Sequence, residues 1–435
     1  METVALYIEE NLLGCALARL CRLALAPNLS GQPTLSSWEY GPLPDADRIR
    51  VLTDILHAQE KPSVEGVSSQ PLVWLVALDE FLGTGTRFSQ ALPFRSLRDG
   101  DAEFWLVQRI HADFPRGYAG RQYGLLRRWL HFHHVVPTHV PPGVPTRVYA
   151  LPDASALALA AILERGAVRV GLVSFDDGVQ EEIQSRPESP HVFLKLSDAG
   201  GRLRAAEAAL EWARQEKLDL LMFPELTLPS PQRRALTERL FDDYRQRDLH
   251  QIPLILLGSF HDLDDEAKCF NRATLVASDG RGLLWADKRR GATFGHRAED
   301  IGKAEAPQGL LPLPFGLLTL SICKDFFDTW MQPVLDCLEP DWVLVPSMSD
   351  SLNPHHARSK AMGDSFGTVS VVANQPMPPG QGHDGDFEYG YVEFAPLEGD
   401  PRPRVEVVFR CQTRPSAQII TISRRNLKRP DNDTK

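Results

Sequence analysis

The sequence is 435 residues long, which exceeds the length that a single hydrophobic core usually supports, so we expect two domains. A hydrophobic content of 43% and a charged content of 24% are typical of a globular protein. The formal net charge of -10 argues against a surface that binds nucleic acid along the whole protein. Six cysteines are scattered without a CxxC pair, which predicts reduced thiols and a cytoplasmic protein without a disulfide framework.

The first 160 residues show no motif that defines their fold. The most apolar stretch, residues 4–26, is interrupted by charges such as Glu9 and Arg19, so it predicts an amphipathic helix and neither a membrane span nor a signal peptide. Further expected elements are a helix at residues 45–59, a strand at 71–80 and helical stretches at 103–113 and 122–132. We interpret residues 1–160 as a mixed or mostly helical domain that binds a protein partner or regulates access.

A proline-rich stretch, VVPTHVPPGVPTRVYALP, precedes the boundary that we place between residues 150 and 166. Neither a helix nor a central strand accommodates so many prolines well. Four histidines lie at its start: His131, His133, His134 and His139. Such a group can bind zinc, but no cysteine or carboxylate lies at ligand spacing. We therefore expect no metal and interpret the histidines as the end of a helix packed against the linker.

From residue 167 onward, short apolar runs alternate with amphipathic helices. The expected strands are residues 167–175, 219–226, 254–260, 272–278, 282–288, 316–325, 341–347 and 368–374, followed by late strands. The expected helices are residues 203–215, one after Pro231, 330–338 and 356–366. Near-continuous apolar strands between helices predict an α/β fold in which helices cover the sheet on one or both faces.

Three chemically capable side chains follow apolar strands. Glu225 lies in LMFPEL, Lys288 in LLWADKRR and Cys323 in LTLSICKDFFD. Open α/β folds place their ligand crevice at the carboxyl ends of strands. Taken singly, each residue has an ordinary explanation: a salt-bridged carboxylate, a surface lysine and a small core thiol. Taken together, they supply a nucleophile, a base and a cation for an oxyanion, which is what acyl transfer needs. A helix start after Cys323 would also favour its thiolate.

The order of these segments resembles the nitrilase, or carbon–nitrogen hydrolase, superfamily. That family has FPE, then a hairpin ending in lysine, then an apolar run ending in IC-x-D. CFNRATLVASDGRGLLWADK is similar to its hairpin, and DWVLVPS, GDSFGTVSVVANQP and YGYVEFAP resemble its later segments. The resemblance covers residues 167–425. It implies a four-layer αββα sandwich and homo-oligomers, with residues 1–160 as an additional domain.

The resemblance also implies a mechanism without a cofactor. Glu225 would take the proton of Cys323, and Lys288 with the backbone N–H of Lys324 would hold the oxyanion of a thioester-forming step. A second glutamate orients the site in many members; Glu299 is our candidate and Glu305 the alternative. Lys324, Ser347, His355 and Asn374 are candidates for binding the substrate, a small-molecule amide.

Some neighbours depart from the family pattern. Lys324 stands where an aromatic residue is usual, and Cys-Lys-Asp replaces the Cys-Trp-Glu of nitrile-hydrolysing members, which favours an amidase. A nitrile hydrolase or acyltransferase on the same triad is one alternative. Another is a weakened scaffold that serves as a binding or effector module. Nitrilase domains also occur in bacterial antiviral systems, although residues 1–160 contain no reverse-transcriptase or nuclease motif.

Overall fold

The computed structural model describes residues 78–79, 94–99, 102–108, 130, 133–175, 181–185, 191–196, 198–246, 250–263, 269–294, 297–299, 301, 304, 306–375, 388–393 and 404–411. Within these ranges no helix is both long and apolar enough to cross a membrane.

One sheet has six strands. In spatial order they are β12 (Gly282–Asp287), β11 (Cys269–Ala277), β10 (Leu254–Leu263), β9 (Leu220–Met222), β6 (Ala167–Ser174) and β20 (Arg404–Cys411). The four strands from β10 to β20 run parallel, and β11 is antiparallel to both of its neighbours. As a result β9, β10 and β12 all end at the same edge of the sheet.

The second sheet has seven strands. In spatial order they are β19 (Gly390–Glu393), β18 (Val369–Gln375), β17 (Trp342–Met348), β16 (Gly316–Leu320), β15 (Gln308–Leu313), β5 (Val144–Val148) and β4 (His139–Val140). Strands β16, β17 and β18 are parallel, whereas β15 and β16 form an antiparallel hairpin. The strand that precedes Cys323, β16, and the strand that contains Ser347, β17, thus belong to this sheet.

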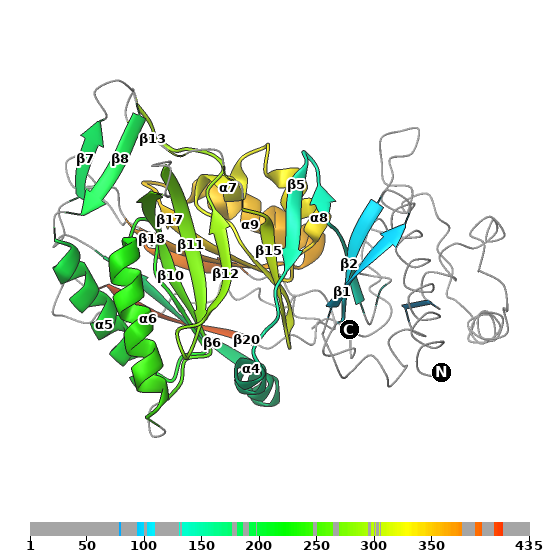
Figure 1. Cartoon of the computed structure of the whole chain (residues 1–435), viewed down its shortest axis with the longest axis horizontal. Coiled ribbons are helices and arrows are strands. Elements are labelled where there is room, and N and C mark those ends of the chain that lie inside the picture. Colours follow the sequence, from blue (N-terminus) through cyan, green and yellow to red (C-terminus); the bar gives the residue numbers. More distant parts are fainter. Residues whose placement is uncertain are drawn as a thin grey trace, which may run out of the picture.

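Alternate residues of the central strands face opposite sides. In β9, Leu220 and Met222 enter the core between the two sheets, while Leu221 packs with the helices α5 (Ala199–Gln215) and α6 (Ser230–Tyr244). Figure 1 shows α5 and α6 side by side against the six-stranded sheet. Burial on both faces explains why the strand sequences are apolar without interruption.

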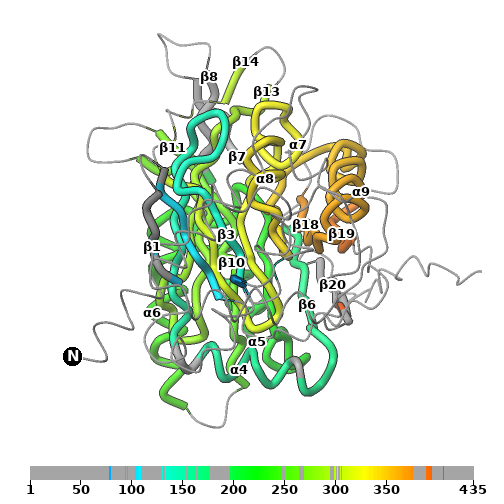
Figure 2. Tube along the Cα trace, turned by 90° about the vertical axis from the view of Figure 1, so that its right-hand side faces the viewer, coloured from blue at the N-terminus to red at the C-terminus, as the bar shows by residue number. Residues whose placement is uncertain are grey.

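Helices also cover the outer face of the seven-stranded sheet. Phe326 of α7 (Lys324–Phe327), Leu335 of α8 (Gln332–Leu338) and Met362 of α9 (Asn353–Phe366) share a buried cluster with β17 and β18. In Figure 2, α9 lies beside β18 and β19. The order of layers is helix, sheet, sheet, helix, so the predicted αββα sandwich is confirmed for the described residues.

Smaller elements flank the sandwich. One three-stranded sheet consists of β1 (Phe94–Asp99), β2 (Ala102–Gln108) and β3 (His133–Pro137). A four-stranded sheet consists of β13 (Thr293–Phe294), β14 (Arg297–Glu299), β8 (His191–Leu196) and β7 (Glu181–Ser185). A helix, α4 (Asp153–Arg165), leads into β6. The three-stranded sheet joins the sandwich through Val107 and Val136, which pack with residues of β5, β15 and α8.

Two of the elements predicted before residue 133 are wrong where the structure describes them. Residues 102–108 form a strand and not a helix, because Phe104 and Leu106 point the same way into the core at the two-residue period of a strand. Leu78 and Asp79, expected in a strand, are helical. The helices expected at residues 4–26 and 45–59 lie outside the described residues, as does the helix at 122–132 apart from Leu130.

Two of the four histidines, His133 and His134, belong to β3 and His139 belongs to β4, not to the end of a helix, while His131 lies outside the described residues. His133 and His134 are buried, and each lies against a carboxylate: Nδ1 of His133 is 2.9 Å from Asp79, and Nε2 of His134 is 3.5 Å from Asp341. Each of the two imidazoles pairs with a different buried carboxylate, which is an arrangement that holds β3 in place.

The proline-rich stretch does contain a strand inside a sheet. Strand β5 lies between β4 and β15, contrary to the expectation that the prolines exclude it. Its pairing with β15 begins at Thr146, one residue after Pro145, so the missing proline N–H does not interrupt that pairing. The second sheet therefore takes up residues before the proposed boundary; the division into domains at residues 1–160 and 167–425 stays a prediction.

Gly258 is the glycine on which the position of Glu225 depends most. It has a φ of 68° within an irregular part of β10, and a Cβ atom there would collide with the Pro224 carbonyl oxygen. We expect Gly258→Ala to lower the free energy of unfolding by about 1–3 kcal/mol, measured by urea denaturation. Gly282→Ala, where the added methyl meets open space, is the matched control and should be nearly neutral. Equal stability of the two variants would contradict this view of Gly258.

Candidate active site

The three predicted side chains follow three different strands. Glu225 lies in the turn after β9, Lys288 directly follows β12, and Cys323 comes three residues after β16. The backbone holds these ends in place: the N–H of Lys288 donates to Asn271 O at 2.8 Å, and that of Cys323 to Pro346 O at 2.9 Å. All three side chains are buried, with exposures of 1% for Glu225, 1% for Lys288 and 5% for Cys323.

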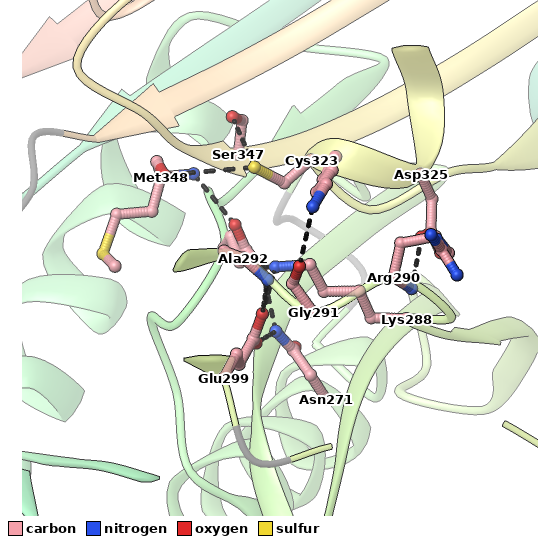
Figure 3. A network of polar contacts seen from close by, with 12 residues as sticks. Asn271, Lys288, Arg290, Gly291, Ala292, Glu299, Cys323, Asp325, Ser347 and Met348 are labelled. Carbon is pink, nitrogen blue, oxygen red and sulfur yellow. Dashed lines mark hydrogen bonds and ion pairs between the residues drawn. The ribbon is translucent and has the colours of Figure 1, made fainter. Parts of the chain in front are cut away.

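Lys288 lies between two carboxylates. Its Nζ is 2.7 Å from Oε1 of Glu225 and 2.6 Å from Oε2 of Glu299. The Asn271 amide donates to Oε1 of both glutamates at 2.9 Å. Figure 3 shows Lys288, Asn271 and Glu299 converging, with Cys323 and Ser347 close by. Glu299, the proposed second glutamate, is therefore in direct contact with the lysine; Glu305 lies outside the described residues.

Glu299 receives more partners than the sequence suggested. His261, near the end of β10, has its Nε2 2.9 Å from Oε1 of Glu299, and the backbone N–H of Ala292 donates to Oε2 at 2.8 Å. With Lys288 and Asn271, these contacts engage both oxygens of a carboxylate that is only 2% exposed. A carboxylate held by so many donors has a fixed orientation, so Glu299 fixes the position of Lys288 in turn.

Neighbouring charges determine the protonation states of Lys288 and Glu299. Burial alone would lower the pKa of Lys288, but the charges of Glu225 and Glu299 outweigh burial and hold this pKa well above its ordinary value. Burial would likewise raise the pKa of Glu299, yet the Lys288 charge and the His261 contact hold it below its usual range. Lys288 is therefore an ammonium and Glu299 a carboxylate at neutral pH.

Cys323 occupies a strained backbone position between β16 and α7. Its φ is 46°, a left-handed conformation that is rare for residues with a side chain. Its sulfur lies 3.9 Å from Met348 O and accepts the Ser347 hydroxyl at 3.4 Å. The Met348 N–H donates to Oε2 of Glu225 at 3.1 Å. One residue of β17 thus contacts both the thiol and the carboxylate, which brings the ends of the two sheets together.

The thiol of Cys323 is protonated at rest, contrary to the expectation of a favoured thiolate. Burial, and next the negative charge of Glu225, raise its pKa to about 12, against the opposing effects of Lys288 and the Ser347 hydroxyl. Helix α7, expected to favour the thiolate, has only four residues, so few peptide dipoles are aligned toward the sulfur. Any loss of the thiol proton at neutral pH therefore needs a base.

Asp325 connects the segments that carry Cys323 and Lys288. Its two oxygens accept the backbone N–H groups of Arg289 at 2.7 Å and Arg290 at 2.8 Å, the two residues after the lysine. Burial raises the pKa of Asp325 to about 7, although these two N–H groups oppose the rise. The aspartate of the IC-x-D motif thus acts on the geometry of the site by holding the loop after β12.

The four predicted substrate-binding residues differ in their surroundings. Ser347 lies beside Cys323, and His355 contacts the serine, whose Oγ is 3.2 Å from Nε2 of the histidine. The Lys324 ammonium donates to Gly291 O at 3.1 Å. Asn374 accepts from Ser349 N at 2.9 Å and donates to Ser349 O and Glu388 O, so it fixes the segment after β17. Substrate binding by these four residues stays a prediction.

Sequence reasoning assigned no role to His261, Asn271 or Met348. The sequence did contain an indication for Asn271. It is a polar residue at a position of β11 where alternation predicts a buried side chain, between the buried Cys269 and Ala273. Met348 acts through its backbone, which a side-chain pattern does not reveal. Within the described ranges no group of three His, Cys, Asp or Glu residues could hold a metal ion.

No protein-family model and no curated protein sequence matches the chain. Among solved structures, the NitN amidase from Nesterenkonia sp. AN1 is similar at 19% identity and a TM-score of 0.35, over 53% of this chain and 86% of that one. A variant of the Nesterenkonia AN1 amidase, described as a nitrilase-superfamily member, is similar at 18% identity and a TM-score of 0.33, over 53% and 85%.

The glutamine-dependent NAD+ synthetase from Acinetobacter baumannii is similar at 16% identity and a TM-score of 0.36. That match covers 51% of this chain and 42% of the synthetase. Amidases, one of them described as a nitrilase-superfamily member, are thus among the solved structures to which the chain is similar.

Proposed function

We propose that this protein hydrolyses a non-peptide carbon–nitrogen bond of a small amide through a thioester on Cys323. The observation that carries the proposal is the buried Glu225–Lys288–Glu299 cluster, whose Glu225 carboxylate is joined to the Cys323 thiol through Met348. The thiol of Cys323 borders the core between the sheets, but two carboxylates and one ammonium beside it add no apolar packing. Such a group is costly to bury, which favours a chemical function.

In the first step Glu225 accepts the proton of Cys323 while the sulfur attacks the carbonyl carbon of the amide. The C–S bond forms as the electron pair of the C=O bond moves onto oxygen. The thiol pKa of about 12 supports proton transfer within this step, because almost no thiolate exists beforehand at neutral pH. Because the Cys323 thiol is protonated before the reaction, Glu225 must act as a general base and take its proton during the attack.

The oxyanion then needs hydrogen-bond donors. An ammonium has three N–H groups, of which Lys288 uses two for Glu225 and Glu299, so one can serve the oxyanion. The second donor is the backbone N–H of Lys324. As the first residue of α7, Lys324 has an N–H without an acceptor inside the helix. Donors fixed in advance stabilise the tetrahedral intermediate more than water does.

In the second step the protonated Glu225 gives its proton to the departing nitrogen as the C–N bond breaks, which leaves a thioester. Water then attacks the thioester carbon and loses a proton to Glu225. The carboxylic acid departs as the C–S bond breaks, and the sulfur recovers the proton from Glu225. The cycle consumes one amide and one water and yields one acid and one amine or ammonia, so it needs no cofactor.

The proposal is tested by measuring ammonia release from a panel of small primary amides, with matching nitriles as a second panel. We expect release from at least one amide, and expect Cys323→Ala to abolish it. Cys337→Ala is the control, because this half-buried cysteine lies in α8, outside the cluster. Full activity of Cys323→Ala would exclude the thioester. Release from nitriles alone would favour the nitrile hydrolase, and release from neither panel would favour a binding module.

A further inference from the structure

A second chain of polar groups reaches the sulfur of Cys323 from the side of α9. The Ser347 hydroxyl, near the end of β17, lies 3.4 Å from Sγ and 3.2 Å from Nε2 of His355, the third residue of α9. Ser347 and His355 are fully buried, each with an exposure of 0%. Buried polar side chains are retained where their hydrogen bonds have a purpose, so this short chain needs an explanation.

The direction of each hydrogen bond follows from the number of protons. A serine hydroxyl has one proton, and Ser347 donates it to Sγ, so toward His355 the hydroxyl can only accept. Nε2 of His355 must then carry a proton. Nδ1 is buried and has no hydrogen-bond partner within the described part of the chain. A second proton on Nδ1 would lack an acceptor, which favours a neutral ring with its single proton on Nε2.

The surroundings of the imidazole agree with a neutral ring. The rings of Phe326 and Phe327 pack against it, with centroids 6.3 Å and 4.8 Å away. Burial, and next the charges of His356 and Lys288, lower the pKa of His355 to about 3. His355 therefore stays uncharged throughout the neutral range and acts there as a fixed donor.

We propose that His355 and Ser347 form a neutral relay of hydrogen bonds to the Cys323 sulfur, and that this relay determines how readily the sulfur gives its proton to Glu225. The inference rests on the proposed role of Cys323 as the nucleophile. Ser347 touches the reacting atom, whereas His355 acts through Ser347 and is a positioning residue. Neither gives up its proton: the proton that moves goes from sulfur to Glu225.

The relay has a clear physical purpose. Burial and the Glu225 charge both work against negative charge on the sulfur, and Lys288 lies on the side of the two glutamates. The Ser347 hydroxyl, which donates to the sulfur from β17, stabilises negative charge on the sulfur as it develops. A neutral histidine behind the hydroxyl fixes its direction, because the oxygen that accepts from Nε2 has only one proton to donate onward.

The test is the rate at which iodoacetamide alkylates Cys323 from about pH 7 to about pH 9. The alkylated peptide is identified and quantified by its mass. We expect Ser347→Ala to slow alkylation about tenfold, since a lost donor raises the thiol pKa by about one unit. His355→Phe keeps the aromatic packing and should slow alkylation several-fold. His355→Gln places an N–H near the position of Nε2 and should restore most of the rate.

Two controls separate the relay from general damage to the fold. His356→Gln changes the next residue, whose exposed side chain pairs with Glu388, and should leave alkylation unchanged. Adding His355→Phe to Ser347→Ala should cause no further slowing, because the histidine acts only through the serine. Unchanged alkylation in Ser347→Ala, or additive effects in the double variant, would overturn the relay.

The alkylation experiment also separates the two proposals. It needs no substrate, so slower alkylation without any amide turnover would support the relay and remove the proposed hydrolase. Amide hydrolysis together with unchanged alkylation in both relay variants would support the hydrolase and overturn the relay.

Discussion

Glu225→Gln should lower amide hydrolysis about a thousandfold and at the same time make Cys323 easier to alkylate. Hydrolysis falls because glutamine can neither take the thiol proton nor return it to the leaving nitrogen. Alkylation rises because the Glu225 charge is one of the causes that raise the pKa of Cys323, and glutamine removes that charge. Opposite changes in two measurements on one variant are hard to produce by misfolding.

The comparison uses the same amide panel and the same iodoacetamide assay at one pH. Glu238→Gln is the matched control, because Glu238 lies exposed on α6, and both rates should match those of the unaltered protein. If Glu225→Gln slowed alkylation as well as hydrolysis, Glu225 would assist loss of the thiol proton in both reactions, and the expectation that its charge limits alkylation would be wrong.

Lys288→Met should lower the free energy of unfolding at pH 7 by about 3–5 kcal/mol and abolish hydrolysis. Methionine has a similar length but no charge, so Glu225 and Glu299 would remain buried beside each other without the cation that contacts both. A loss of about 1 kcal/mol or less would place the contacts among ordinary exposed ion pairs and contradict this view.

The effect should depend on pH. In the unaltered protein the pKa of Glu299 is held below its usual range, so its stabilising contribution is present above that range and is lost as the pH falls. In Lys288→Met the carboxylate pKa values should instead rise, so acid relieves the strain. Urea denaturation at pH 7 and near pH 4.5 should therefore show a smaller difference between the two proteins in acid.

A second substitution identifies the cause. Glu299→Gln added to Lys288→Met removes one of the two uncompensated charges and should recover part of the lost stability, but none of the hydrolysis. No recovery of stability would mean that the uncompensated charges of Glu225 and Glu299 are not the cause of the loss. Ammonia release and the urea midpoint are enough to distinguish these outcomes.

The α/β class was predictable because the strands carry a strong signal, whereas the four-layer order was implied only by the family resemblance. Residues such as Leu220 to Met222 face the inter-sheet core and the helices in alternation, and such strands appear in the sequence as uninterrupted apolar runs. Strand β2 gave a weaker signal, because Trp105 is only half-buried and Glu103 and Gln108 flank the run. An apolar run this short fits helix and strand almost equally well.

The position of Glu299 was predictable from its place between the lysine and the cysteine, but its contact with His261 was not. That contact depends on the path of β14 beside the end of β10, a tertiary arrangement with no local pattern. The protonation of Cys323 was also misjudged, because the sequence shows a following helix but neither its length nor the burial of the thiol. Local sequence features identified Glu299 and Cys323 as candidates. Their contacts and protonation states depend on tertiary neighbours that the local sequence does not show.

The junction at Met348 has a consequence for how the protein can vary. Glu225 is carried by one sheet and Cys323 by the other, and Met348 of β17 contacts both. Sliding one sheet over the other would separate these two side chains without breaking either sheet. In the proposed mechanism the aliphatic side chains between the sheets therefore set the distance from base to nucleophile, and we expect a substitution among them to lower turnover while the protein stays folded.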